Sequence, residues 1–243
     1  MSTVETKKIE PASGTTLTLG ASGDVVTAPA GVTVKTNTVK DAGGNTLWTS
    51  DGSGTVSSVT SDLQGGMTLI SSQTASNSAS VEFTSGIDST YDEYVFYFVD
   101  VNPATDAASF AFQVNASGQT GFNETMTTST FRATHREADT AEVLEYDIYN
   151  DQAQGTGYQL LSYYIGNAAD ECVVGELHLF NPASTTYVKH FYARTNCVMG
   201  GVNPQSQDYF TAGYINTTSA IDEIAFKMGS GNFDGQIHCF GVS

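Results

Sequence analysis

Aromatic residues are distributed very unevenly along this chain of 243 residues. Trp48 is the only aromatic residue before position 81, and all 13 phenylalanines and all 12 tyrosines follow it. Large aromatic side chains supply much of the area that a globular core buries, so the two parts of the chain cannot fold in the same way. The distribution predicts an extended segment over residues 1–60, a neck over residues 61–80 and a globular domain over residues 81–243.

The first 80 residues are rich in Gly, Ser and Thr and contain repeated turn signals, such as Asp-Ala-Gly-Gly-Asn at 41–45. The β-branched runs between these turns predict strands of about three to five residues. Such strands carry too few apolar side chains to build a core within one chain. The segment is therefore either a flexible linker or a narrow β stalk in which about three chains pool their apolar faces, and the regular turn spacing favours the stalk. Its predicted core consists of Leu17, Leu19, Val26, Val32, Val34, Leu47 and Trp48.

From residue 81 onward the chain alternates apolar and polar residues over longer, aromatic-rich runs. Residues 94–101 are apolar on both faces of the expected strand, which predicts a central strand that is covered on both sides. About ten such runs follow one another at even spacing, with Gly, Asn and Pro turns between them, and they include residues 159–165, 173–180 and 221–228. The pattern predicts an all-β chain whose C-terminal domain is a jelly-roll-like antiparallel β-sandwich.

Charge and cysteine content restrict the partners of the chain. It has 26 acidic and 9 basic residues and a formal net charge of -17, so we expect no nucleic-acid partner. No apolar run approaches the length of a membrane span, and none follows Lys7 and Lys8 as a secretion signal would require, so we expect cytoplasmic synthesis without membrane insertion.

Cys172, Cys197 and Cys239 are too far apart for a metal clip and odd in number, which predicts reduced core thiols.

The sequence contains no recognisable pattern of an active site or a cofactor site. HExxH and CxxC pairs, a Gly-x-Ser-x-Gly elbow and a phosphate loop before a helix are all missing from it. His178 and His190 fall in expected strands, where we interpret them as ordinary strand residues. The acidic stretches at 88–93, 137–145 and 170–171 are interpreted as solvated loop charge, with calcium binding or glycoside hydrolysis as alternatives. We expect no enzyme activity, no catalytic residues, no metal and no cofactor.

Recognition by loop aromatics leaves no spacing pattern, so candidates for it come from position alone. Five aromatic residues lie in or near expected loops together with Asn, Asp and Gln, a composition that can stack on sugar rings. The alternative is that they form the rim of the core. These predicted receptor-binding residues are Phe122, Tyr149, Tyr158, Tyr163 and Tyr164.

Several long motifs resemble the C-terminal domain of fibre and spike proteins from the virions of marine tailed phages, including cyanophages. The leader GTTLTLGASGD at 14–24 is similar to segments of the same fibre proteins. The motifs are FTSGIDSTYDEYVF at 83–96, VNPATD at 101–106, LHLFNPASTTYVKHF at 177–191, GYINTTSAI at 213–221 and FKMGSGN at 226–232.

The resemblance implies a homotrimeric tail or head fibre that is made in the host cytoplasm and carried on the virion surface, which lysis of the host would release. Its N-terminal segment would bind other virion proteins, and its β-sandwich head would contact a glycan or protein of the host surface. A capsid-bound decoration or head-fibre protein is the alternative, followed by a glycan-binding or glycan-degrading protein. The motifs carry no catalytic residue.

Overall fold

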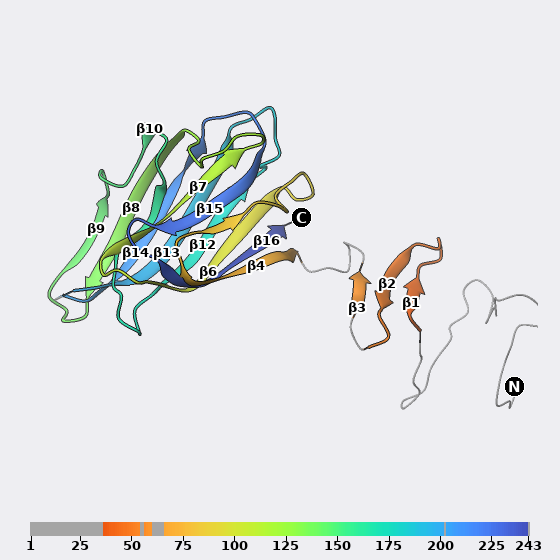
Figure 1. The fold of residues 1–243 in the computed structure, drawn as a ribbon, viewed down its shortest axis with the longest axis horizontal. Coiled ribbons are helices and arrows are strands. Elements are labelled where there is room, and N and C mark those ends of the chain that lie inside the picture. Colours follow the sequence, from red (N-terminus) through yellow and green to blue (C-terminus); the bar gives the residue numbers. More distant parts are fainter. Residues whose placement is uncertain (1–35, 54–55, 60–65, 202, 243) are drawn as a thin grey trace, which may run out of the picture. The chain divides into compact units, whose positions relative to one another are not determined.

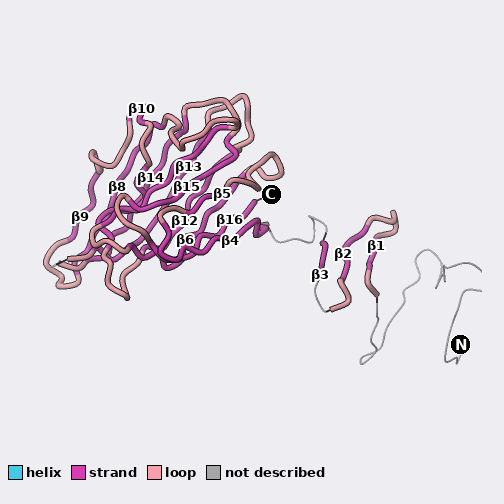
Figure 2. Tube along the Cα trace, in the orientation of Figure 1, coloured by secondary structure: helices cyan, strands magenta, loops and turns pink. Residues whose placement is uncertain are grey.

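The structure, a computed structural model, describes residues 36–53, 56–59, 66–201 and 203–242. The chain divides into two compact units, residues 1–63 and residues 64–243. Strands and loops account for all the described residues, and no helix occurs among them (Figure 2). The prediction of an all-β chain is therefore confirmed. Within the described ranges there is accordingly no helix long and apolar enough to cross a membrane.

The smaller unit contains an antiparallel sheet in the order β1 (Thr38–Lys40), β2 (Thr46–Ser50) and β3 (Val56–Val59). Trp48 on β2 pairs with Val39 and Val59 on the neighbouring strands. Leu47 and Trp48 are only half-buried, and none of the residues 36–53, 56 and 59 is buried. Among the side chains described in this unit, the sheet therefore buries no core within one chain. The other predicted stalk-core residues lie outside the described residues, and they are Leu17, Leu19, Val26, Val32 and Val34.

The larger unit contains thirteen strands that form one hydrogen-bonded set (Figure 1). For three of these strands, at residues 159–165, 173–180 and 221–228, the predicted bounds agree with the observed ones. The strands are β4 (Met67–Ser78), β5 (Val81–Phe83), β6 (Glu93–Pro103), β7 (Ala108–Ala116), β8 (Met126–Arg136), β9 (Glu142–Tyr146), β10 (Ala153–Gly155), β11 (Gln159–Ile165), β12 (Val173–Phe180), β13 (Lys189–Met199), β14 (Gln205–Ile215), β15 (Ile221–Met228) and β16 (Phe233–Val242).

These strands are arranged in two antiparallel layers. The large layer has the order β4-β16-β6-β12-β13-β14-β8-β9, and the short strand β10 pairs with the start of β8. The small layer has the order β11-β7-β15-β5, and one pairing, Ile165 with Met199, joins β11 to β13. The arrangement is an antiparallel β-sandwich, as predicted, and it is compatible with a jelly roll.

The core lies between the two layers and combines aliphatic side chains with a cluster of phenylalanine rings. Phe96 and Phe98 of the large layer pack on Phe226 and Phe110 of the small layer, with ring centroids 5.1–5.5 Å apart. Phe112 and Phe191 make a further contact between the layers at 4.9 Å. Edge-to-face contacts of this kind stabilise a core beyond the burial of area alone.

The three cysteines are free, as predicted. Cys197 and Cys239 are buried in the core, whereas Cys172 is half-buried. Burial raises the pKa of Cys197 to about 11 and that of Cys239 to about 12. Both buried thiols therefore stay protonated and unreactive at neutral pH.

The predicted neck over residues 61–80 differs from the structure. From Met67 to Ser78 the chain forms β4, which pairs along its length with β16 and so belongs to the sandwich. Of the twelve residues of β4 only Ala75 is buried, and Ile70 packs against the core from a partly buried position. An edge strand with so few core contacts has the polar composition of a linker, which explains the difference.

Candidate functional site

The outer face of the large layer, whose side chains point away from the small layer, is the most unusual surface of the described structure. In a two-layer sandwich the outward side chains are normally polar, because water covers them. On β6 this face instead carries Val95, Tyr97 and Val99, of which Val95 is buried, Tyr97 is half-buried and Val99 is 38% exposed. The prediction that β6 is covered on both sides is therefore confirmed at Val95 and wrong at Val99. No third layer covers Val99 among the described strands.

Aromatic rings continue across this face on neighbouring strands. Tyr97 on β6 contacts Phe240 on β16 at 5.6 Å between ring centroids, with the ring planes nearly perpendicular. Tyr192, Phe210 and Phe131 follow on β13, β14 and β8, with centroids 6.3 and 5.0 Å apart and almost parallel rings. We call these five residues the outer aromatic row. Phe131 is 46% exposed, so the row remains open to a ligand at this end.

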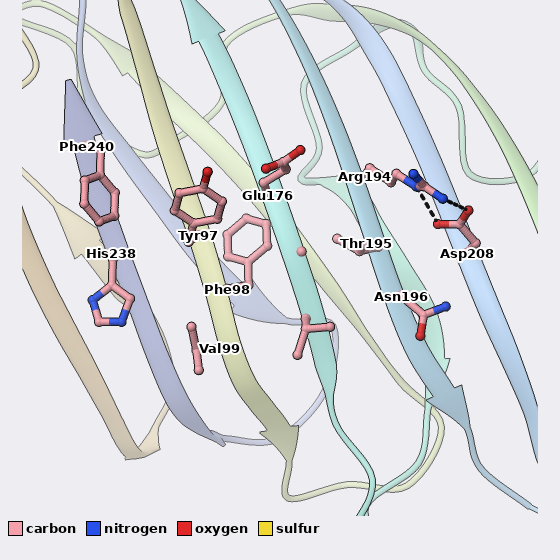
Figure 3. A pocket seen from close by; sticks show the side chains of 12 residues that line it. Tyr97, Phe98, Val99, Glu176, Arg194, Thr195, Asn196, Asp208, His238 and Phe240 are labelled. Carbon is pink, nitrogen blue, oxygen red and sulfur yellow. Dashed lines mark hydrogen bonds and ion pairs between the residues drawn. The ribbon is translucent and has the colours of Figure 1, made fainter. Parts of the chain in front are cut away.

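A groove of about 740 Å³ lies on the same face and extends across β16, β6, β12, β13 and β14 (Figure 3). The pairing of β12 with β6 shifts register between Val173 and Gly175, and the groove lies over this irregularity. Bulges of this kind often redirect side chains beside functional sites. The outward side chains that line the groove are Tyr97, Val99, Val174, Glu176, Arg194, Asn196, Asp208, His238 and Phe240.

Polar side chains border the groove along β13 and β14. Arg194 donates two hydrogen bonds to Asp208, from Nε at 3.1 Å and from Nη2 at 2.9 Å (Figure 3). The hydrogen bond with Asp208 and its negative charge raise the pKa of Arg194. Asn196 is oriented by its Nδ2, which donates to Ser206 Oγ at 3.0 Å. The border thus presents a fixed guanidinium, a carboxylate and an amide next to apolar rings.

His178 lies on the outer face beside the groove and between two carboxylates. Its Nδ1 is hydrogen-bonded to Glu93, and its Nε2 is 3.5 Å from Oε1 of Glu176. The imidazole stacks on Tyr192 at 4.4 Å between centroids. Burial and the charges of Glu93 and Glu176 raise the pKa of Tyr192, so its hydroxyl stays protonated at neutral pH. His190 contacts Tyr214 instead, so the two histidines have separate surroundings.

The five predicted receptor-binding aromatics lie elsewhere, and only two of them contact each other in a ring pair. Tyr163 and Tyr164 on β11 have ring centroids 4.3 Å apart. Tyr158 lies under Lys227, whose Nζ is 4.1 Å from the ring centroid. The backbone N–H of Phe122 donates to Asn115, and Tyr149 is 87% exposed on the loop after β9. None of the five lines the groove.

Metal binding has no visible basis in the described ranges, where no group of three or more His, Cys, Asp and Glu side chains could hold an ion. The carboxylate-dense stretches supply hydrogen bonds instead. Arg132 pairs with Glu145 at 2.6 Å, and Asp88 accepts from the backbone N–H of Thr90 at 2.8 Å.

The groove residues escaped prediction because they lie in the middle of strands. Side chains from five different strands meet there, and sequence spacing does not report their proximity. One signal did exist, namely the apolar residues on both faces of 94–101. A strand of this kind is either covered by a third layer or exposes a binding face, and only the first possibility was predicted.

Comparisons with known proteins yield no relative: no protein-family profile matches the chain, and neither curated proteins nor solved structures show significant similarity to it.

Proposed function

We propose that the chain is a structural appendage, a fibre or spike, of a tailed-phage virion, and that it is not an enzyme. Its β-sandwich head adsorbs to a glycan or protein of the host surface, and its N-terminal segment attaches it to other virion proteins. The resemblance of the motifs at 83–96 and 177–191 to marine phage fibres supports the virion assignment. The outer face of the large layer supports the recognition role.

The single observation that carries the recognition role is the outer aromatic row beside the groove, in which Phe131 is 46% exposed and the other four rings are half-buried. Apolar surface that remains in water costs solvation free energy of about 25 cal/mol for each Å². A ligand that covers the exposed parts of Tyr97 and Phe240 removes part of this cost. An aromatic face bordered by polar groups is typical of a recognition surface.

The smaller unit supports assembly from several copies. Its three-stranded sheet buries none of the residues 36–53, 56 and 59 within one chain, although Leu47, Trp48 and Val39 are available on β1 and β2. Sister chains that cover these side chains would give the sheet the core that it lacks. We therefore propose a homotrimer, made in the host cytoplasm and carried on the virion surface.

Immunogold electron microscopy tests the virion assignment. Antibodies raised against the purified chain are applied to intact particles of the phage that encodes it. We expect label at the tail or its fibres. Label spread over the capsid would favour the decoration or head-fibre alternative, and unlabelled particles would contradict both. In parallel, the purified chain should compete with the phage for adsorption to host cells.

A further inference from the structure

We propose that the groove on the outer face binds a short run of uncharged sugar residues in a polysaccharide. The inference rests on the proposed function for its biological role, and it names the ligand class and the residues that bind it. The proposed site is centred on Tyr97, Phe240, Arg194, Asp208 and Asn196.

The apolar side of the groove matches the C–H face of a pyranose ring. Tyr97 and Phe240 meet almost at right angles, at 77°, and form a corner of two aromatic rings. Val99 and Val174 extend this apolar surface and are 38% and 40% exposed. A sugar ring that packs into the corner covers these groups from water, and aromatic faces bind such C–H surfaces well.

The polar side of the groove matches the hydroxyl groups of the sugar residues that follow in the same polysaccharide, because β13 and β14 lie two and three strands away from Tyr97 on β6. A hydroxyl both donates and accepts hydrogen bonds, so a suitable site offers both kinds of partner. Asp208 and Glu176 accept, and Arg194 donates. The bidentate pairing of Arg194 with Asp208 holds both groups in place before a ligand arrives, which lowers the entropic cost of binding.

Charge decides against an acidic ligand. Glu176 and Asp208 border the groove with one guanidinium, that of Arg194, and the full chain has a net charge of -17. A carboxylated or sulfated polymer would be repelled at the site and by the molecule as a whole. The groove volume of about 740 Å³ also suits a small ring system, because small-ligand sites span roughly 300–1,000 Å³.

The test measures retention of the purified full chain by immobilised polysaccharides. The neutral probes are a β-glucan, a mannan and an unsulfated galactan, and a sulfated galactan is the matched anionic probe. We expect at least one neutral polymer to retain the chain, and the sulfated galactan to bind it more weakly than its unsulfated counterpart.

Three variants locate the binding site. Tyr97→Ala should weaken retention at least tenfold. Asn196→Ala, at an exposed position that carries little risk for folding, should weaken it severalfold. Tyr187→Ala, which changes a 70% exposed ring outside the groove and outside the predicted receptor-binding residues, should leave it unchanged and serves as the control.

Specific results would overturn the inference. These are a lack of binding to all three neutral polymers, binding that survives Tyr97→Ala and Asn196→Ala, or host-cell binding that is lost after protease treatment but kept after removal of polysaccharide. If the chain is found on virions but binds no neutral polymer, this inference fails and the appendage proposal stands. If the chain binds a neutral polymer but is missing from virions, the appendage proposal fails and this inference stands.

Discussion

Asp147 shows at the scale of a single residue how this sandwich tolerates a polar interior. Tyr209 donates a hydrogen bond to Asp147 Oδ2 at 2.5 Å, and Asn150 Nδ2 donates to the same oxygen at 2.7 Å. Burial alone would raise the pKa of Asp147, but the hydrogen bonds from Tyr209 and Asn150 outweigh it, and the pKa is lowered. The buried carboxylate is therefore ionised at neutral pH and contributes stability there.

Tyr209→Phe should lower the free energy of unfolding by about 1–3 kcal/mol at pH 7, because it removes a hydrogen bond from a buried charge. A lowered pKa means that the stabilisation is present above the ordinary value of 3.8 and is lost as the pH falls below it. The difference in free energy of unfolding between the unaltered protein and the Tyr209→Phe variant should therefore shrink below about pH 4. Urea unfolding at a series of pH values measures it.

Tyr146→Phe is the matched control for this prediction. The Tyr146 hydroxyl also bonds to an aspartate, Asp151, at 2.6 Å, but on the exposed strand β9. Because water can replace that hydrogen bond, we expect Tyr146→Phe to leave the free energy of unfolding unchanged. Equal losses in the two variants would show that the buried Asp147 network does not contribute as argued.

Of the residue-level predictions from the sequence, the free cysteines are confirmed, whereas the receptor-binding residues stay a prediction. The cysteines were predicted as free core thiols because composition and spacing suffice for that conclusion. The receptor-binding prediction relied on loop position, which placed Phe122 and Tyr149 among the candidates and left Tyr97 and Phe240 out. Whether a strand aromatic faces the core or the solvent depends on the second layer, which the sequence does not reveal.

At the scale of elements, β12 owes its shape to Gly175. This residue has a φ of 152° and lies where the pairing with β6 shifts register. A Cβ atom built there would lie 2.3 Å from the carbonyl oxygen of Arg194 and 2.7 Å from Cα of Thr195. Both contacts are with backbone, which cannot move aside as a flexible side chain can.

Gly175→Ala should therefore lower the free energy of unfolding by at least about 2 kcal/mol, through overpacking and backbone strain. It should also weaken ligand binding at the groove, because Arg194 would have to shift. Gly66→Ala is the control, since Gly66 has open space around it and no positive φ. Thermal unfolding of the three proteins measures the effect, and a Gly175→Ala protein as stable as the control would refute it.

Prediction of the elements succeeded where a turn signal ends an apolar run and failed where there is no such run. β11, β12 and β15 are followed directly by Gly166, Asn181 and Gly229, so their ends followed from the sequence. β4 was taken for a neck because its sequence is rich in Ser and Thr and has no apolar run. Its place at the sheet edge comes from backbone pairing with β16, which composition does not report.

At the scale of the whole molecule, the smaller unit leads to a prediction about assembly. The full chain has a mass of 25.7 kDa, and if the proposed homotrimer forms through the N-terminal sheet, the chain should elute as a particle of about three times that mass. Salt should favour this assembly by screening the net charge of -17 on each chain. Size-exclusion chromatography with light scattering measures the mass.

A fragment of residues 64–243 provides the control for assembly. It retains the aromatic core of the sandwich, so we expect it to be folded and monomeric. If the full chain is also a stable monomer at micromolar concentration, the pooled stalk core is refuted. If the fragment alone forms the trimer, the contacts belong to the head and the role assigned to Leu47 and Trp48 is wrong.

The position of β16 between β4 and β6 also affects how the protein is made. β4 opens the larger unit and β16 closes it, and in the described structure β4 has no other strand partner on the sheet path. A nascent chain can therefore not complete the large layer until residue 242 has emerged from the ribosome. Products of premature termination would lack this central strand, remain open and be degraded, which keeps defective copies out of any assembly.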